Sequence, residues 1–125
     1  MEAARHVHIE GVLVVDLPPR LTILVHESVM QAVLRKPETA LVLDASRVTS
    51  FEPSTIAAST RAVERLAGAG YRLLALVIRA PLVRMGASTL LPTARLITGF
   101  NLRIVGTLAE ALVLARGEQR RNQLL

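Results

Sequence analysis

Cysteine and tryptophan are absent from this 125-residue sequence, and its aromatic side chains are limited to one Tyr and two Phe. Without cysteine, the chain has no disulfide framework, no thiol chemistry and no cysteine-based metal site. With so few aromatic rings, it lacks the stacking surfaces on which single-stranded nucleic acids are usually held. The longest unbroken apolar run, at residues 73–78, is far shorter than the roughly 18 residues that span a bilayer. We therefore expect a soluble, cytoplasmic protein with an aliphatic core, no membrane span and no bound cofactor.

Lysine is almost absent as well: Lys36 is the only one, and arginine supplies nearly all of the positive charge behind the net +5. The arginines are scattered along the chain, apart from Arg116, Arg120 and Arg121 near the C-terminus. A scattered basic composition without stacking aromatics is not the pattern of a nucleic-acid-binding surface. We therefore expect no nucleic-acid partner. We predict a last helix at residues 108–116, followed by a short basic tail from about residue 117.

Residues 40–55 are the most informative segment, because a buried strand there runs through a turn into a helix. The unbroken apolar run at 40–43 is typical of a central strand that is covered on both faces. Asp44 and Ser46 then favour a turn, and Pro53 suits the first turn of a helix, where its missing N–H costs nothing. Ser54 follows at the helix N-terminus, where backbone N–H groups and the helix dipole favour negative charge. The segment therefore places a hydroxyl where it can carry or bind a phosphate.

The rest of the chain alternates strands and helices after an initial hairpin with Gly11 at its turn. We predict strands at 6–10, 12–17, 40–44, 72–78 and 102–105, and helices at 21–35, 53–67, 81–98 and 108–116, with Pro92 splitting the third. We expect these strand residues to be buried next to one another in one sheet: Leu41, Val42, Leu43, Leu74, Leu76 and Val77. The alternation predicts an α/β fold with helices packed on a single sheet.

Residues 44–48 read Asp-Ala-Ser-Arg-Val and residues 51–55 read Phe-Glu-Pro-Ser-Thr. This motif resembles the switch region of the STAS domain family, the fold of bacterial anti-sigma factor antagonists. In that family a buried strand ends in Asp-x-Ser-x-Val, and an acidic residue, two serines and a glycine follow. Glu52 occupies the acidic position and Ser54 that of the phosphorylated serine, whereas Pro53 and Thr55 replace the first serine and the glycine. Because the order of elements also matches, the resemblance implies a mixed sheet of four to five strands with about four helices, mainly on one side.

The resemblance also implies a function. It indicates a non-enzymatic regulatory module that acts through protein–protein contacts as an anti-sigma factor antagonist, with an anti-sigma factor or a serine kinase as its partner. Ser54 is then the candidate phosphoacceptor, and residues 44–55, which we name the switch loop, form the candidate partner surface. The candidate contact residues of that surface are Asp44, Ser46, Arg47, Glu52 and Thr55. No Ser/His/Asp order, paired carboxylates or metal-ligand cluster stands out in the sequence, so we do not expect an enzyme.

Other interpretations of these residues stay open. Asp44 could instead have a structural role, accepting N–H bonds in the turn after its strand. Arg79 and Arg84 follow a predicted strand and flank a helix start, so they are a candidate anion site, with a plain structural loop as the alternative. The long apolar segment at 81–99 could cover a pocket, which would suit a small-ligand or lipid-binding STAS-like module without a serine switch. A homodimer or a larger homo-oligomer is also compatible with the sequence.

Overall fold

The computed structural model describes residues 3–124 and shows a five-stranded sheet in the order β1-β2-β4-β6-β7. Four neighbouring strands are parallel: β2 (Val12–Asp16), β4 (Ala40–Asp44), β6 (Leu73–Val77) and β7 (Asn101–Val105). The edge strand β1 (Arg5–Ile9) runs antiparallel to β2 and is joined to it by a two-residue turn at Glu10 and Gly11. Both turn residues have positive φ, 52° and 82°, which is the geometry of a tight hairpin. The predicted mixed sheet is thus confirmed.

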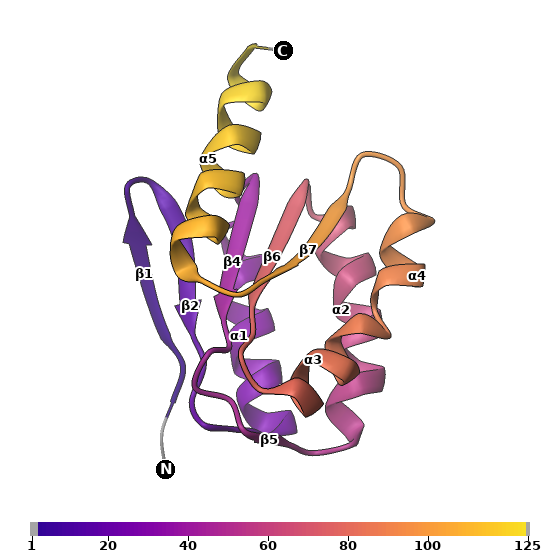
Figure 1. Cartoon of the computed structure of the whole chain (residues 1–125). Helices are drawn as coiled ribbons and strands as arrows, with labels where there is room; N and C mark the ends of the chain where they lie inside the picture. The colour runs from indigo at the N-terminus through magenta and orange to yellow at the C-terminus, as the bar shows by residue number, and fades with distance from the viewer. Residues whose placement is uncertain (1–2, 125) are drawn as a thin grey trace.

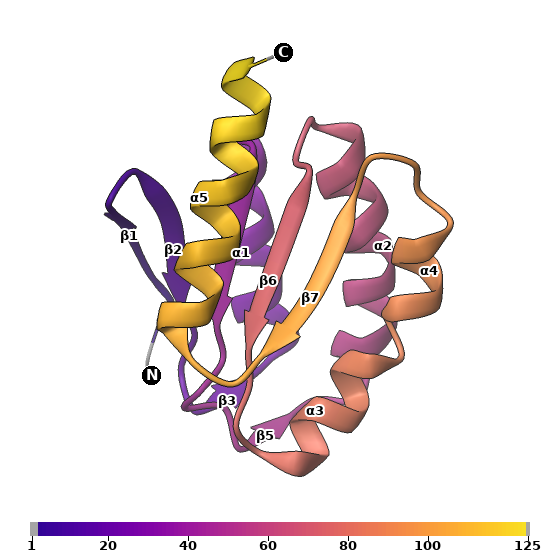
Figure 2. The same ribbon diagram turned by 45° about the horizontal axis from the view of Figure 1, so that its top comes forward.

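Helices cover both faces of this sheet, as Figures 1 and 2 show. One face carries α1 (Ile23–Arg35), α2 (Ser54–Gly68), α3 (Pro81–Ser88) and α4 (Leu91–Arg95). The other face carries only α5 (Leu108–Leu124). Proline marks two of the helix starts, because Pro81 lies in the first turn of α3 and Pro92 in that of α4. Among the described residues, no helix is both long and apolar enough to cross a membrane.

Alternate residues of each strand point to opposite faces, so the sheet separates two cores. Leu41 and Leu74 belong to the core under helices α1 to α4, whereas Val42 and Ala75 belong to the core under α5. These central residues are at most 4% exposed, as the apolar runs predict. The prediction is wrong for Leu43, which is only partly buried and borders a cavity described below.

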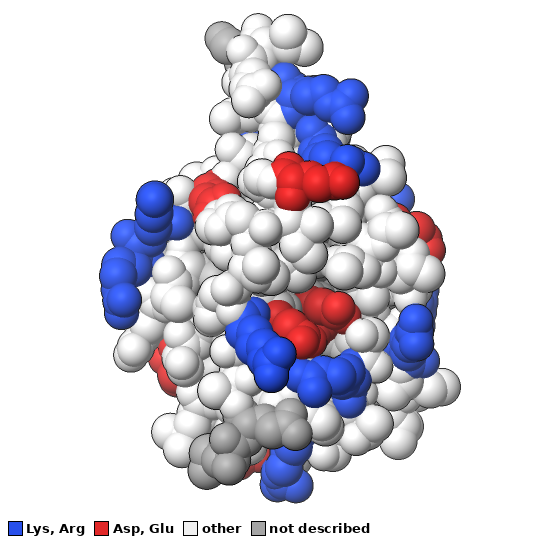
Figure 3. All heavy atoms as spheres, turned by 90° about the vertical axis from the view of Figure 1, so that its left-hand side faces the viewer, with Lys and Arg blue, Asp and Glu red and all other residues white. Residues whose placement is uncertain are grey.

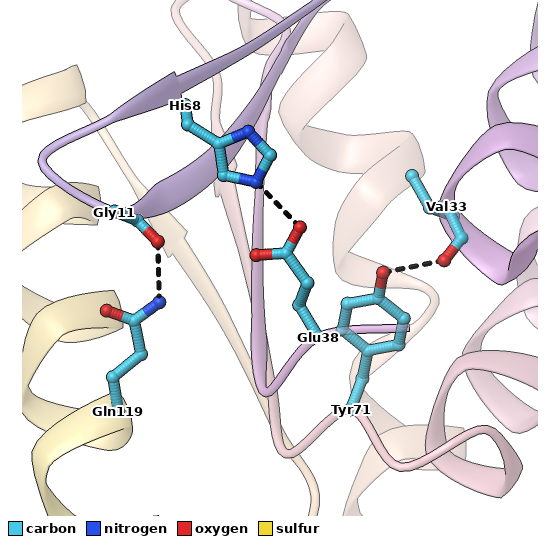
Figure 4. A network of polar contacts seen from close by, with 6 residues as sticks. All are labelled: His8, Gly11, Val33, Glu38, Tyr71 and Gln119. Carbon is cyan, nitrogen blue, oxygen red and sulfur yellow. Dashed lines mark hydrogen bonds and ion pairs between the residues drawn. The ribbon is translucent and has the colours of Figure 1, made fainter. Parts of the chain in front are cut away.

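The C-terminal helix is longer than predicted, because α5 continues to Leu124 where we expected a tail from about residue 117. Glu118 is buried and its carboxylate lies 2.7 Å from the guanidinium of Arg121, one turn later. The side chain of Gln119 donates a hydrogen bond of 3.0 Å to the carbonyl of Gly11 in the first hairpin (Figure 4). The part of α5 beyond residue 116 is therefore held by a contact with a hairpin more than a hundred residues earlier. The basic composition of this segment does not predict such a contact.

The amino edge of the sheet, opposite the switch loop, is held by further polar contacts (Figure 4). The buried hydroxyl of Tyr71 donates a hydrogen bond of 2.7 Å to the carbonyl of Val33 near the end of α1. Burial raises the pKa of this phenol, so it stays protonated and keeps its donor. On the hairpin, Nε2 of His8 lies 2.7 Å from the carboxylate of Glu38. The contact between His8 and Glu38 links the first hairpin to the segment that precedes β4.

Candidate functional site

The switch loop lies at the carboxyl edge of the parallel strands, where β4 leads toward β5 and α2 (Figure 2). Oδ1 of Asp44 accepts a hydrogen bond of 3.1 Å from the N–H of Ser46. The N–H of Ala45 donates to the carbonyl of Val77 at 2.8 Å, which ties the start of the loop to the neighbouring strand. Asp44 therefore has the structural role that was one of its two interpretations: its carboxylate fixes the turn that ends β4.

A short parallel strand pair, which the sequence pattern does not predict, anchors the middle of the loop. In this pair β3 (Arg20–Leu21) lies against β5 (Ser50–Phe51). Glu52 follows, and its N–H donates to the carbonyl of Leu21 at 3.0 Å. Its carboxylate accepts a hydrogen bond of 2.9 Å from the N–H of Ile23, the first residue of α1. Glu52 thus satisfies one of the otherwise unpaired N–H groups at that helix terminus.

Ser54 and Thr55, which begin α2, differ sharply in exposure. Ser54 is exposed, whereas Thr55 is 2% exposed and its hydroxyl donates a hydrogen bond of 2.6 Å to the carbonyl of Glu52. The prediction that Thr55 forms part of a contact surface is therefore wrong, because its side chain points into the fold and closes the turn before α2. Pro53 is the N-cap of this helix, no side chain caps it, and its first turn contains no acidic residue. The first turn of α2, at the positive end of the helix dipole, therefore carries no acidic side chain beside Ser54.

Arg47 and Ser46 lie at the outer side of the loop. Arg47 is exposed and its guanidinium lies 3.4 Å from the carboxylate of Asp16 at the end of β2. Ser46 is partly exposed next to it. Figure 3 shows the side of the molecule that lies to the left in Figure 1, where acidic side chains are interspersed among the basic ones. That face of the molecule is therefore of mixed charge.

Apolar side chains extend the exposed surface from the start of α2 onto α3. Ile56 is 36% exposed, and on α3 Leu82 and Met85 are 72% and 66% exposed. Phe51 of the switch loop, which leads into α2, packs closely against α3: a Cβ atom added to Gly86 would lie only 3.1 Å from Cζ of Phe51. We name these three exposed side chains (Ile56, Leu82 and Met85) the apolar rim.

The two arginines of the candidate anion site are both exposed, but they belong to different surroundings. Arg84 lines a hollow of about 740 Å³ beside the edge strand β7, together with Arg95 and Arg103. Arg79, two residues after the end of β6, is not among the residues that line this hollow. The pairing of Arg79 with Arg84 stays a prediction, and the arginines that the structure places around Arg84 come from later in the chain.

An apolar cavity of about 120 Å³ lies between the sheet and helices α1, α2 and α3. Of its 22 lining residues, only His26, Thr55 and Ser59 have polar side chains. Val83, Gly86 and Ala87 of α3 form one wall, so the cavity lies under the start of the 81–99 segment, where a pocket was considered. His26 was missed by sequence reasoning, because a lone histidine in an amphipathic helix gives no signal of a cavity behind it.

His26 is the unusual member of this lining. Its Nδ1 is buried and has no hydrogen-bond partner among the described residues. Burial lowers the pKa of the imidazole; Glu27 opposes this, while Arg65 and Arg61 on α2 lower the pKa further. The ring is therefore neutral at pH 7, with one nitrogen as a donor and the other as an acceptor.

No family model and no curated protein matches the sequence, but solved structures do. An anti-sigma factor antagonist from Mycobacterium paratuberculosis is 23% identical with a TM-score of 0.67, and the match covers 91% of this chain and 93% of that one. SpoIIAA, an anti-sigma factor antagonist solved in its unphosphorylated form, is 16% identical with a TM-score of 0.62, covering 92% and 99%. An uncharacterized protein with a SpoIIAA-like fold from Shewanella loihica is 12% identical with a TM-score of 0.60, covering 90% and 92%.

These matches extend over nine-tenths or more of every chain, so they compare whole folds and not a shared fragment. At such low identities the likeness is one of backbone architecture, and it carries no residue role by itself. In this chain the matched architecture consists of the mixed five-stranded sheet and its helices. The chain has a STAS-like fold, the fold of anti-sigma factor antagonists.

Proposed function

We propose that this chain is a non-enzymatic regulatory module that acts as an anti-sigma factor antagonist, with Ser54 as its phosphoacceptor. The observation that carries the proposal is the position of Ser54: it is exposed, and it is the first residue of a 15-residue helix. The partner expected from the fold is an anti-sigma factor with serine kinase activity. Such a partner must reach the serine hydroxyl and must sense the charge that phosphorylation adds to it.

The electrostatics at the start of α2 favour a phosphate. A phosphoserine carries about −1.5 to −2 charges at pH 7, and the N-terminus of a helix favours negative charge. Because no side chain caps α2 and no acidic residue lies in its first turn, an added phosphate meets no competing carboxylate on that turn. Phosphorylation should therefore be tolerated by the fold, and its effect should fall on binding.

The loop before Ser54 supports the same proposal because it is rigidly anchored. Hydrogen bonds from the N–H groups of Thr49 and Glu52 to the segment at 19–21, together with the Glu52 contact to α1, fix the loop backbone. A contact surface that is ordered before binding loses less conformational entropy on association. The apolar rim beside Ser54 adds exposed hydrophobic area of the kind that protein partners cover. The proposed docking surface therefore combines Ser46, Arg47, Ser54 and the apolar rim.

Ser54→Asp tests the switch. We expect the variant to melt within a few degrees of the wild type, yet to bind the anti-sigma factor about tenfold more weakly or worse, because like charges across an interface cost several kcal/mol. The matched control is Ser54→Asn, which has nearly the shape of Asp without its charge and should bind like the wild type. Binding is measured by calorimetry, and the phosphosite is mapped by mass spectrometry after incubation with the serine kinases of the source organism. No phosphate on Ser54, combined with equal binding of the Asp and Asn variants, would contradict the switch.

Arg47→Glu tests the docking surface independently of phosphorylation. Reversal of an exposed charge usually changes stability little, although this variant also loses the contact to Asp16. If the loop contacts the partner, the association rate should fall several-fold and its dependence on salt should change. Arg103→Glu on the edge strand β7, also exposed, is the matched control and should leave the rate unchanged. The same rate for both variants would exclude Arg47 from the contact.

A further inference from the structure

We propose that the open edge of β7 binds an extended acidic segment of a partner protein, which adds a strand to the sheet and places its carboxylates among the arginines around that edge. β7 is the last strand of the sheet, on the side of α4 (Figure 2). None of the residues that line the hollow beside it belongs to the docking surface proposed above. The inference therefore concerns a second interaction surface, which does not depend on Ser54.

The backbone of β7 is hydrogen-bonded on one side only. Among residues 3–124, β6 is the only strand that pairs with it, in parallel register. At the two ends of β7, the N–H of Asn101 and the carbonyl of Val105 bond to residues that flank β6, at 2.9 and 3.0 Å. In a parallel ladder, alternate residues turn their N–H and C=O groups to the other side, and in β7 these are Leu102 and Ile104. Their donors and acceptors are therefore available to a further strand.

The hollow of about 740 Å³ runs along this open edge. Four successive strand residues, 101–104, line it. Side chains of successive residues point to opposite faces of a sheet, so all four can line one hollow only where it follows the edge between the faces. Residues of α3 and α4 form the other wall. An extended chain paired with β7 would lie about 4.8 Å from it, between the strand and these helices.

The charge around the hollow has one sign. Arg84 on α3, Arg95 on α4 and Arg103 on β7 line it and are exposed, and no acidic residue is in the lining. A fourth arginine lies near the amino end, because a Cβ atom added to Gly99 would lie 3.7 Å from Nη1 of Arg72. Within the described part of the chain, none of these four arginines forms an ion pair. A cluster of unpaired guanidinium groups attracts carboxylates.

The two faces of the edge define the sequence of the added strand. Arg103 is on the α5 face, because it is in register with Ala75 of the core under α5. An acidic residue opposite it would form a favourable cross-strand pair. On the other face the partly buried Leu91, Ile97 and Ile104 line the hollow, where aliphatic side chains fit. Because strand residues alternate between faces, the segment should alternate acidic and aliphatic residues.

A second copy of this chain is a poor occupant. Pairing two β7 strands would bring the Arg103 side chains of both copies to one edge, and like charges there are unfavourable. The other edge strand, β1, carries Arg5, His6 and His8 and no acidic residue. The net charge of +5 also opposes self-association. The charges therefore favour an acidic partner over another molecule of the same chain.

A peptide of four Glu-Val repeats is the probe, titrated into the whole chain labelled with ¹⁵N. We expect saturable shifts of the β7 amides and slower hydrogen exchange at Leu102 and Ile104, whose N–H groups gain partners. A peptide of four Gln-Val repeats should bind at least about fivefold more weakly, the scale of a lost exposed ion pair. A peptide with four Glu followed by four Val has the same composition and should not protect the two amides.

Two results would overturn the proposal at this stage. One is no saturable binding of the Glu-Val peptide, or binding that leaves the amides of Leu102 and Ile104 unprotected. The other is protection of these amides that rises with protein concentration without any peptide, which would identify a second copy as the occupant.

Charge reversal gives the second arm. Arg103→Glu and Arg84→Glu should each bind the Glu-Val peptide about fivefold more weakly, and the second variant remains usable if the first does not fold. Arg5→Glu, an exposed arginine on the opposite edge strand β1, is the matched control and should bind like the wild type. Equal affinities of all three variants would exclude the hollow as the site. Because no anti-sigma factor is present in this assay, its failure leaves the docking proposal at the switch loop untouched.

Discussion

The two faces of the sheet are packed in different ways, although they share the same strands (Figures 1 and 2). Under α5 the core consists almost entirely of Ala and Val, with Leu73 as its only larger fully buried residue. Under α1 to α4 the core is larger and contains eight leucines together with Met30, Tyr71 and Phe100. All the residues that line the 120 Å³ cavity lie outside the α5 core. The single helix α5 packs closely over small side chains, whereas α1, α2 and α3 pack over larger ones and leave the cavity between them and the sheet.

The difference in packing coincides with a difference in role between the face under α5 and the face under α1 to α4. Ala111 and Ala115 of α5 are fully buried against the strands, so their small side chains let the helix approach closely. On the other face the same elements that enclose the cavity, α2 and α3, also present Ser54 and the apolar rim. The proposed docking surface therefore lies on the less tightly filled side of the molecule. The following predictions test whether the difference in packing has measurable consequences.

The largest effect is expected from truncation of a fully buried leucine in the central strand β4. Leu41→Ala removes a side chain that is 0% exposed, and it should lower the free energy of unfolding by about 3–5 kcal/mol. Leu43→Ala, two residues along on the same face, should cost less, near about 2 kcal/mol, because Leu43 already borders the cavity and is partly exposed. Urea denaturation with unchanged m-values measures both. Equal losses would mean that the cavity does not relieve packing on this face.

A matched enlargement compares the two faces directly. Ala115→Leu forces a larger side chain between α5 and the sheet and should cost about 1–3 kcal/mol through overpacking. Ala62→Leu makes the same change at the cavity lining, where space is available, and should cost less than about 1 kcal/mol. The comparison is made by urea denaturation in the absence of any ligand. A larger loss for Ala62→Leu than for Ala115→Leu would contradict the proposed difference in packing.

The strands and helices could be predicted because their signals are local. Apolar runs gave β4 and β6, and Pro92 marked the break between α3 and α4. The pair of short strands β3 and β5 could not be predicted, since two residues each show no periodicity and their pairing depends on the carbonyls of Pro19 and Leu21. The extension of α5 likewise depends on a contact with a hairpin at the other end of the chain.

The candidate site was predicted in part. The motif identified the loop and placed Ser54 correctly at an exposed helix start, but it could not tell an exposed hydroxyl from a buried one at the next residue. Thr55, the second residue of α2, is buried because its side chain points toward the core. Its hydroxyl donates a hydrogen bond to the carbonyl of Glu52. A pocket under the 81–99 segment was considered from the sequence, but its lining and His26 could not be found, since a cavity is made by the fit of α1, α2 and α3 and has no motif of its own.

The smallest expected effect is a dependence of stability on pH that comes from the cavity face. Burial lowers the pKa of His26 below its ordinary value of 6.5, with Glu27 on the same helix opposing and Arg65 and Arg61 on α2 adding to the shift. The unfolded chain therefore takes up a proton at a higher pH than the folded one, and stability falls as the pH drops below about 6.5 until the folded-state pKa is passed. His26→Gln should flatten the stability curve in that window. Melting temperatures measured from pH 7.5 down to about pH 5.5, above the range where carboxylates titrate, give the comparison. If the wild type and His26→Gln lose stability in parallel, His26 is not held neutral by the fold.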